Sequence, residues 1–348
     1  MSIGVTMKTI AAAAGVTQAT VSMSLANNPR IPATTRERIL AIAQRLGYRP
    51  NPYISTLMRV RRQGRPLKDK PVLALVCALG AADGWREHPA ATVRQQREGA
   101  LERAALRGYR AQEFWLHRDG MTGARFSEML HTRGIHGLLL SPMEDGAPPP
   151  ALQWEKFAAV SLSVPLPALN VTTVCNDHYF SALQAVRECH RRGYRRPGLV
   201  MLRSHLQRFQ GRWLAGCLVA PQVLAGLRLA KPLVIDDWKK DEPRLLRWLT
   251  EERPDVLLTA NGDLLRAILQ RRGWKIPGDV GLAWLACPEP DHAISGIWQN
   301  GRLIGATAID ALVGLVERHE RGLPPQATTL MVEGVWNSGA TLRPLPAE

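Results

Sequence analysis

The sequence has few cysteines and no arrangement of them that builds a bonded framework. Only five of its 348 residues are cysteine, an odd number, and no two of them lie within a dozen positions of each other. This spacing excludes a disulfide scaffold and a CxxC metal or redox pair. We therefore expect five free thiols, no structural metal and no cofactor.

Long apolar runs are also missing. The longest, residues 72–82, is far shorter than the roughly 20 residues that span a bilayer. Near the N-terminus, Lys8 and Thr9 lead directly into a short apolar segment, and a helix-start pattern stands where a signal peptide would have its cleavage site. The sequence predicts a cytoplasmic protein that neither spans a membrane nor is secreted.

Catalytic motifs are absent from the sequence. It contains no GxGxxG, GxxxxGK[ST], GxSxG or HExxH pattern. We therefore predict no catalytic residue and no enzymatic activity, although the lack of a motif does not by itself exclude an enzyme, because fold alone does not set function.

Acidic residues are scarce in the first fifth of the chain. The whole chain has a net charge of +15 and a pI of about 10.3, and residues 1–70 hold twelve Lys and Arg residues against two acidic ones. This segment therefore supplies +10 of the total, and the rest of the chain supplies only +5. The asymmetry predicts a basic nucleic-acid-binding module joined to a nearly neutral domain.

The basic segment predicts a helix-turn-helix. Thr6 and Thr17 are suited to cap its first two helices. Gly15 lies in the tight turn between them, so the short second helix is the candidate for insertion into the major groove of DNA. The expected helices are Met7–Ala14, Gln18–Ala26 and about Ala33–Leu46.

The second helix carries candidate base-reading side chains. With Val21 and Leu25 facing the core, Gln18, Ala19 and Met23 face outward, where Gln pairs with adenine and the apolar side chains contact a thymine methyl. The alternative is a solvated helix with Met23 merely exposed. Short hydroxyls and a basic run are expected on DNA phosphates: Thr6, Thr17, Thr20, Ser22, Arg59, Arg61 and Arg62.

Residues 51–66 are interpreted as a hinge. Pro52 stands at the first turn of a helix of about eight residues, which is too short to be stable alone and should order only against a second copy and DNA. Leu57 on this helix is a candidate wedge for the minor groove. The alternative is an ordinary basic linker.

The remainder of the chain alternates apolar runs with helical stretches. This alternation is typical of a parallel-sheet α/β fold, and the number of runs predicts two lobes with a ligand cleft between them. The expected strands are Val72–Cys77, Arg110–Trp115, Gly137–Leu140, Ala158–Leu162, Pro197–Leu202, Pro232–Ile235, Val256–Thr259 and Val280–Leu285. The expected helices are Thr92–Arg107, Ala124–Thr132, Tyr179–Arg192, Gln207–Ala220, Glu242–Glu252, Gly262–Arg272 and Leu303–Arg321.

Several segments resemble lactose-repressor-type (LacI/GalR) transcription regulators. The N-terminal matches are specific, and looser ones recur in order along the whole chain. They comprise residues 6–11, 14–22, 35–39, 46–52 and 57, followed by 174–177, 193–196, 254–255, 260–261, 277–281, 297–299 and 305.

The resemblance implies a domain organisation. Residues 1–50 would form the helix-turn-helix domain, 51–66 the hinge, and 67–348 a dimerising two-lobed domain similar to periplasmic sugar-binding proteins. Lobe 1 would comprise about 71–170 and 298–325, and lobe 2 about 171–297 and 326–345. The chain would cross between lobes near 169–173, 295–299 and 324–331.

The resemblance also implies roles at the DNA. Gln18 and Ala19 fall on the family's main base-reading positions, and Leu57 falls on its minor-groove wedge. Met23 departs from the family, because that position is usually Arg, and Pro32 replaces the usual Ser cap of the third helix.

The candidate effector residues are Asp177, Trp213, Asn261, Gln299 and Ser141. Asp177 matches a position that commonly bonds ligand hydroxyls, and its alternative role is a helix N-cap. Trp213 replaces a common ligand-binding Arg, and its alternative role is packing. Ala286 replaces a sugar-binding Asp, so the ligand is an unusual sugar, a non-sugar, or absent.

Together these features predict a homodimeric, sequence-specific DNA-binding repressor on a near-palindromic operator, gated by a small, sugar-like effector between the lobes. The alternatives are a stand-alone small-molecule-binding protein and an α/β enzyme with a basic nucleic-acid anchor.

Overall fold

The chain divides into two units, Met1–Lys70 and Pro71–Glu348. The computed structural model describes residues 7–25, 31–46, 70–144, 146–162 and 169–346. The expected hinge over residues 51–66, with Leu57, Arg59, Arg61 and Arg62, lies outside the described residues, as does Thr6.

The described residues of the first unit, here called the head, form three short helices. They are α1 (Met7–Ala14), α2 (Gln18–Leu25) and α3 (Ala33–Arg45), as the sequence predicted. Ile10, Val21 and Ile39 are fully buried at their meeting point, closed by the small side chains of Ala11, Ala14 and Ala43.

Two local features fix the turns of the head. Gly15 has a φ of +65°, in the left-handed region that favours glycine, and ends α1. Thr17 then caps α2, because its Oγ1 accepts a hydrogen bond from the Thr20 N–H at 3.1 Å. At the N-cap of α3, Pro32 makes no side-chain hydrogen bond.

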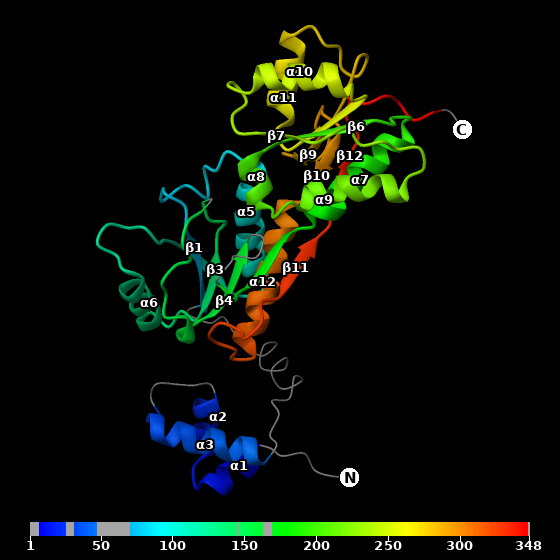
Figure 1. Ribbon diagram of the computed structural model, residues 1–348. Coiled ribbons are helices and arrows are strands. Elements are labelled where there is room, and N and C mark those ends of the chain that lie inside the picture. The colour runs from blue at the N-terminus through cyan, green and yellow to red at the C-terminus, as the bar shows by residue number, and fades with distance from the viewer. Residues whose placement is uncertain (1–6, 26–30, 47–69, 145, 163–168, 347–348) are drawn as a thin grey trace, which may run out of the picture. The chain divides into compact units, whose positions relative to one another are not determined.

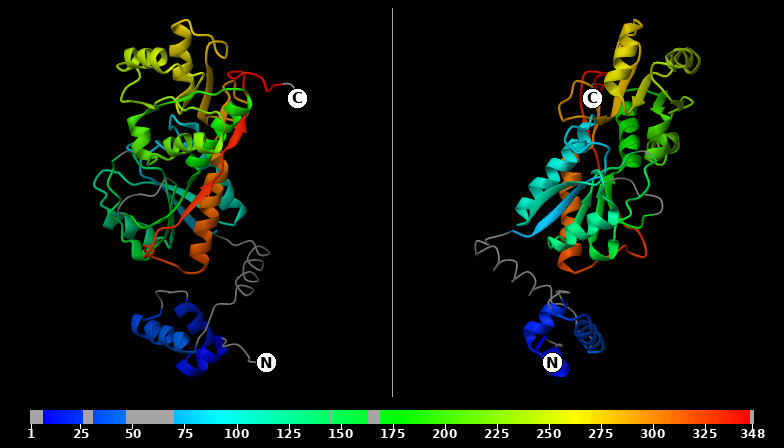
Figure 2. Two further views of the ribbon diagram at one scale, coloured as in Figure 1. Left: turned by 45° about the vertical axis from the view of Figure 1, so that its right-hand side comes forward. Right: turned by 90° about the vertical axis from the view of Figure 1, so that its left-hand side faces the viewer.

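The second unit contains two six-stranded sheets, each forming one lobe (Figures 1 and 2). The first sheet has the order β11-β5-β4-β3-β1-β2 and the second β12-β10-β9-β8-β6-β7. Every pair is parallel except β10 with β12. The first sheet comprises β1 (Val72–Cys77), β2 (Arg110–Trp115), β3 (Gly137–Leu140), β4 (Ala158–Leu162), β5 (Thr172–Asn176) and β11 (Thr329–Val332). The second comprises β6 (Pro197–Leu202), β7 (Leu233–Ile235), β8 (Val256–Thr259), β9 (Gly281–Cys287), β10 (Gly296–Trp298) and β12 (Val335–Asn337).

Each sheet has an apolar core on both faces, which is why most of its strands read as continuous apolar runs. Helices α5 (Ala91–Leu106) and α12 (Gly301–Glu317) pack on one face of the first sheet, and α6 (Gly123–Thr132) packs on the other. Helices α7 (His178–Arg191) and α9 (Arg212–Val223) cover one face of the second sheet, and α10 (Glu242–Glu252) and α11 (Gly262–Arg271) cover the other. The short elements are the 3₁₀ turn η1 (Trp154–Lys156) and α8 (Arg203–Arg208).

Helices α5 and α12 approach each other through glycines. A Cβ atom on Gly305 would lie 1.9 Å from the Gln96 carbonyl oxygen, and one on Gly99 would lie 2.0 Å from the Arg302 carbonyl oxygen. No side chain fits in that space. The two helix backbones therefore pack directly against each other.

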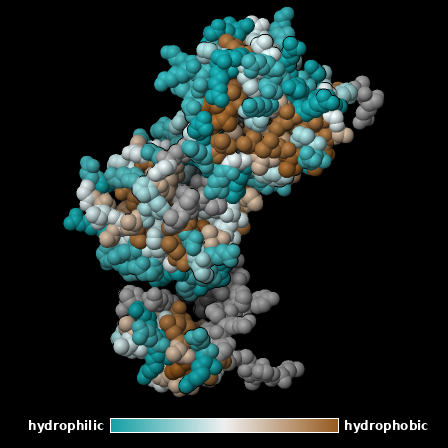
Figure 3. Space-filling model, in the orientation of Figure 1, coloured by the Kyte–Doolittle hydropathy of each residue, from teal (hydrophilic) through white to brown (hydrophobic). Residues whose placement is uncertain are grey.

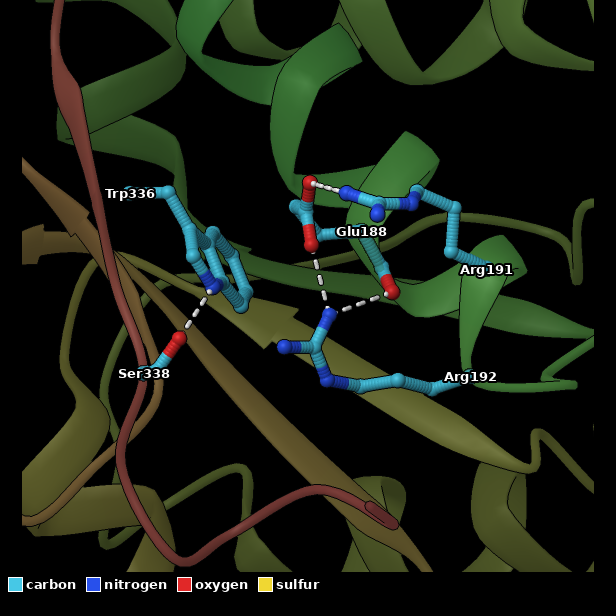
Figure 4. Close-up of polar contacts among 5 residues, drawn as sticks. All are labelled: Glu188, Arg191, Arg192, Trp336 and Ser338. Carbon is cyan, nitrogen blue, oxygen red and sulfur yellow. Dashed lines mark hydrogen bonds and ion pairs between the residues drawn. The ribbon is translucent and has the colours of Figure 1, made fainter. Parts of the chain in front are cut away.

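The C-terminal end of α7 and the edge strand β12 each carry local hydrogen bonds (Figure 4), and a cation–π contact joins the two elements. The Glu188 carboxylate accepts hydrogen bonds from Arg191 at 2.9 Å and Arg192 at 2.6 Å. This holds the Arg192 guanidinium 5.3 Å from the centre of the Trp336 ring, a cation–π distance, while Trp336 Nε1 donates to Ser338 at 3.1 Å.

The predicted two-lobed α/β architecture is confirmed, but four short strands were missed. β5, β10, β11 and β12 contain three to five residues each and carry polar residues in or beside them. The expected assignment of residues 171–297 and 326–345 to lobe 2 is wrong at the start of each range. These starts contain β5 and β11, which pair within the first sheet. The sheet that a short strand joins is decided by pairing across the chain, which local pattern does not report.

Two helix expectations also need correction. The expected helix over Gln207–Ala220 is two helices, because Gln210 and Gly211 have φ values of 51° and 68° and break it between α8 and α9. The expected helix Leu303–Arg321 ends at Glu317, and His319 beyond it has a φ of 58°. Left-handed residues of this kind end a helix without any change in hydrophobic period.

Candidate DNA-binding and effector sites

The α2 helix presents the candidate base-reading residues on the head. Gln18 is exposed and Met23 is half-buried, while Val21 is fully buried, so the expected inward and outward faces are present. The side chains of Ala19 and Ser22 lie outside what the structure describes. Gln18 is the first residue of α2, where an N-terminal side chain of a recognition helix meets base edges.

The hydroxyls expected on phosphates already have partners in the head. Thr17 Oγ1 lies 2.9 Å from Thr20 Oγ1 as well as capping the Thr20 N–H. Arg38 Nη2 donates to the Ala14 carbonyl oxygen at 3.3 Å, which brings a positive charge to the end of α1. The turn before α2 is therefore hydrogen-bonded, and the Arg38 guanidinium lies at the end of α1 beside it.

Four candidate effector residues follow the carboxyl ends of strands in the two sheets. Ser141 follows β3, Asp177 follows β5, Asn261 lies two residues after β8, and Gln299 follows β10. Ligands of parallel α/β folds bind at such edges. The site predicted from the sequence is thus consistent with the topology, although its members come from both lobes.

Most of these side chains are engaged within the protein. Asp177 caps α7, because its Oδ1 accepts from the Phe180 N–H at 2.9 Å. Ser141 is fully buried and its Oγ accepts from the Ala78 N–H at 2.9 Å. Gln299 is 6% exposed and donates to the Leu285 carbonyl at 3.3 Å. Asn261 differs, since its Oδ1 is buried without a partner among the described residues.

Trp213 is packed inside the second lobe. Its side chain is 2% exposed and its ring centre lies 4.5 Å from that of Phe209 and 5.1 Å from that of His178. Burial and the nearby Arg212 guanidinium lower the pKa of His178 to about 3, so this imidazole is uncharged at neutral pH. Sequence reasoning missed His178 and Phe209, since neither belongs to a motif.

Hydrogen bonds from Arg208 and with Gln95 are among those that join the two lobes directly. The Arg208 guanidinium, on α8 of the second lobe, donates to the Met143 carbonyl after β3. Gln95 on α5 donates through Nε2 to the Pro288 carbonyl after β9 at 2.6 Å, and its Oε1 accepts from Trp298 Nε1 at 3.3 Å. A movement of one lobe against the other breaks or reforms these bonds.

The sequence of the head matches a known family. Residues 6–51 match the family described as bacterial regulatory proteins, lacI family, a span that covers the three helices of the head. The head is therefore similar to the DNA-binding domain of lacI-family proteins. No curated protein matches the chain in sequence.

Solved structures share the fold of this chain over most of its length or nearly all of it. The transcriptional regulator CelR in complex with cellobiose matches with a TM-score of 0.58 at 20% identity, covering 97% of this chain and 99% of that one. The Lac repressor dimer bound to operator and the anti-inducer ONPF matches with 0.55 at 18% identity, covering 98% and 99%. CcpA of Lactococcus lactis matches with 0.57 at 13% identity, covering 79% and 100%. The predicted pairing of a helix-turn-helix head with a two-lobed domain is therefore confirmed as the fold of this chain.

No helix among the described residues has the length and apolarity of a membrane span. Within the same residues, no three His, Cys, Asp or Glu side chains are grouped so as to hold a metal ion. The five cysteines are all buried and free.

Proposed function

We propose that this chain is a homodimeric repressor that binds a near-palindromic operator and releases or grips it in response to a small molecule between its lobes. The observation that carries the proposal is the lacI-family head, with Gln18 exposed at the start of its second helix. The separate two-lobed unit, whose lobes contact each other through polar side chains such as Gln95 and Arg208, supports a gating role.

The proposed base readers are Gln18, Ala19 and Met23. Gln18→Ala removes a bidentate partner of adenine and should cost roughly 1–3 kcal/mol at one symmetric base-pair position. Selection of binding sites from random duplex DNA, with wild type and variant in parallel, measures this. The same base profile for both proteins would show that Gln18 reads no base.

Leu57 and the basic residues Arg59, Arg61 and Arg62 are proposed as hinge contacts with DNA. Leu57→Ala should weaken specific binding and reduce bending, and leave salt-dependent, non-specific binding nearly unchanged. Hydrogen exchange of residues 52–59 with and without selected DNA is the control. Equal protection in both states would contradict coupled folding of the hinge.

The proposed effector residues are Asp177, Trp213, Asn261, Gln299 and Ser141. A ligand acts only by binding the open and closed lobe arrangements with different affinity, and a coupling of about 1–3 kcal/mol corresponds to a 5- to 150-fold change in operator affinity. CelR is described in complex with cellobiose, which supports a carbohydrate as the first ligand to test.

Asp177→Asn is the most direct test of the effector site. The amide oxygen still accepts from the Phe180 N–H, so the cap of α7 is kept while the charge is lost. We expect ligand-free operator binding to persist and the ligand response to weaken. An unchanged ligand response would restrict Asp177 to its capping role.

The proposed homodimer needs an association surface on the two-lobed unit. In Figure 3, apolar side chains gather on the second lobe over α7 and α9, where Leu218 and Val223 are 51% and 54% exposed. Exposed apolar groups of this kind support association with a second copy. Sedimentation equilibrium of the full chain tests it, and a monomer at the concentrations that bind operator would contradict it.

A further inference from the structure

Arg212 connects the second lobe to the first through two sulfur atoms. It is the first residue of α9 in the second lobe. Its guanidinium Nη1 lies 3.5 Å from Met331 Sδ on β11 and 4.0 Å from Cys175 Sγ on β5, and both strands belong to the first sheet. Thioether and thiol sulfur atoms are weak hydrogen-bond acceptors. The charged guanidinium is therefore held loosely at a point where the lobes meet.

Met331 is the most exposed methionine in the described part of the chain. The residue is 53% exposed, whereas Met143 is 7% and Met201 1% exposed. It lies on the edge strand of the first sheet, and in Figure 1 this strand points toward the second lobe near α9. Oxidants convert an accessible thioether to a sulfoxide, a polar group that methionine sulfoxide reductases convert back. The sulfur atom beside Arg212 is therefore open to reversible modification.

Cys175, whose sulfur atom faces the same guanidinium, is protected from such oxidants. The residue is 3% exposed, and burial raises the pKa of its thiol to about 11. A thiol reacts as the thiolate, which is scarce at neutral pH when the pKa is raised in this way. The other cysteines are buried as well. Of the two sulfur atoms at Arg212, oxidation therefore selects that of Met331.

We propose that Met331 is a site of reversible oxidation, and that its sulfoxide oxygen accepts a hydrogen bond from Arg212 and stabilises the contact between the lobes. With hydrogen peroxide, a lone pair of Sδ attacks one peroxide oxygen and the O–O bond breaks. The new S–OH group passes its proton to the departing hydroxide, which leaves as water. The sulfur is oxidised, the peroxide is reduced, and no other reactant is consumed.

Oxidation strengthens this contact because the new acceptor faces a positive charge. A sulfoxide oxygen is a better acceptor than a thioether sulfur, and hydrogen bonds to a charged donor are roughly twice as strong as neutral ones. The methionine side chain is unbranched and flexible, so a small rotation brings the oxygen within reach of Nη1, which already lies 3.5 Å from Sδ. Methionine oxidation commonly disrupts a protein by placing a polar group in an apolar site. At Met331 the same change stabilises the arrangement in which α9 and β11 touch.

The consequence for DNA binding rests on the proposed function. A change that favours one arrangement of the lobes alters operator affinity only if the lobes gate the head. The modification and the strengthened contact between α9 and β11 do not depend on DNA, so they are tested separately.

Peptide mass spectrometry of the full chain after treatment with hydrogen peroxide tests the site of oxidation. We expect Met331 to be oxidised at least about tenfold faster than Met143 and Met201, because oxidation follows exposure. Equal rates at the three methionines, or oxidation of Cys175 before Met331, would overturn the assignment.

Amide hydrogen exchange of β11 and of the first turn of α9 tests the contact. We expect exchange in both segments to be about tenfold slower in oxidised than in untreated wild type, and a methionine sulfoxide reductase to restore the original rates. Arg212→Leu removes the donor and should show no slowing on oxidation. Circular dichroism checks that this variant folds.

Two variants at position 331 test the same contact with the arginine in place. Met331→Gln supplies an amide oxygen where the sulfoxide oxygen would be and should slow exchange without any oxidant. Met331→Leu is the matched control, because it is similar in size, carries no acceptor and cannot be oxidised. Unchanged exchange in oxidised wild type, equal slowing in Arg212→Leu, or slowing of Met331→Leu by peroxide would each contradict the proposal.

A mobility-shift assay with selected operator DNA separates this inference from the proposed function. Oxidised wild type and Met331→Gln should change operator affinity in the same direction, by about fivefold or more, while Met331→Leu should not respond to peroxide. Slower exchange with unchanged affinity would support the modified contact and count against gating of the head by the lobes. Changed affinity without slower exchange would overturn the contact between Met331 and Arg212.

Discussion

The head and the two-lobed unit are stabilised in different ways. The head has one core of six buried residues beneath three helices of eight to thirteen residues. The two-lobed unit has four cores, one on each face of each sheet, and a helix pair that packs backbone to backbone. A small domain buries a smaller share of its surface on folding, so each buried side chain in the head carries a larger share of its stability.

The largest effect is expected in the core of the head. Ile39→Ala removes a fully buried side chain and should cost about 2–5 kcal/mol, which is comparable to the whole stability of a domain of this size. We expect operator binding to be lost while the thermal transition of the two-lobed unit is unchanged. Calorimetry and a mobility-shift assay measure the two.

Leu40→Ala is the control for that variant, because Leu40 is the neighbouring residue on α3 and is 44% exposed. Its effect should stay within about 0.5 kcal/mol. If both variants melted the head equally, the contrast between a single small core and four larger ones would not describe this molecule.

The next effect concerns close packing in the first lobe. Gly305→Ala places a Cβ 1.9 Å from the Gln96 carbonyl oxygen, so α5 and α12 must separate, at a cost of about 3 kcal/mol. Urea unfolding of the two-lobed unit gives the change in free energy, and operator affinity per folded molecule should be retained.

Gly314→Ala on the same helix is the matched comparison. There a Cβ meets only the end of the flexible Arg318 side chain at 3.1 Å, and alanine is the better helix former, so the variant should gain up to about 1 kcal/mol. If Gly314→Ala lost as much free energy of unfolding as Gly305→Ala, the cause would be helix geometry and not the contact between α5 and α12.

A pH-dependent effect follows from a buried histidine in the second lobe. His178 has a pKa of about 3 in the folded protein against an ordinary value of 6.5, because burial and Arg212 disfavour its charged form. Below pH 6.5 the unfolded chain takes up this proton and the folded chain does not, so stability falls as pH decreases from 6.5 toward 3. The slope for one such group is at most about 1.4 kcal/mol per pH unit.

His178→Phe should flatten that pH dependence. His136, with a pKa lowered to about 4 chiefly by burial, contributes over a similar range and remains in the variant. The comparison is therefore the difference between wild type and variant in urea unfolding at pH 7, 5 and 4. Parallel curves would mean that His178 takes up protons equally in the folded and unfolded chain.

The smallest effect returns to the head. Thr17→Ala removes the cap of α2 and should cost about 1 kcal/mol, whereas Thr34→Ala, at an exposed position in the first turn of α3, should cost less than half as much. Amide hydrogen exchange of α2 measures the local opening. Equal exchange rates in the two variants would show that the Thr17 cap does not stabilise α2.

The sequence pattern predicted strands correctly where every residue of the strand is apolar and buried. It failed where a strand forms only by pairing with a segment far away in sequence. The apolar runs at Val72–Cys77 and Val256–Thr259 are strands with the expected bounds. A strand that is buried on both faces is a continuous apolar run, so it can be recognised from its own residues. Thr172–Asn176 and Thr329–Val332 were missed, since they are short and partly polar; the first joins the sheet by pairing with β4, and the second by pairing with the first.

The candidate sites divide in the same way. The outward position of Gln18 and the cap at Thr17 follow from helical spacing within a dozen residues, so local reasoning found them. The contact of His178 with Trp213 joins residues that lie 35 positions apart on two helices, and no local sequence pattern predicts it.

The sequence by itself determined that this chain has a basic helix-turn-helix head of the lacI family and a long α/β unit of two parallel sheets. Charge, helical period, apolar runs and local motifs are properties of neighbouring residues, and they persist in any arrangement of the chain. Only the tertiary structure decided which sheet β5 and β11 join, how closely α5 and α12 approach, and which sulfur atoms meet the Arg212 guanidinium. Those outcomes depend on distances between segments far apart in sequence, which are fixed only when the cores pack.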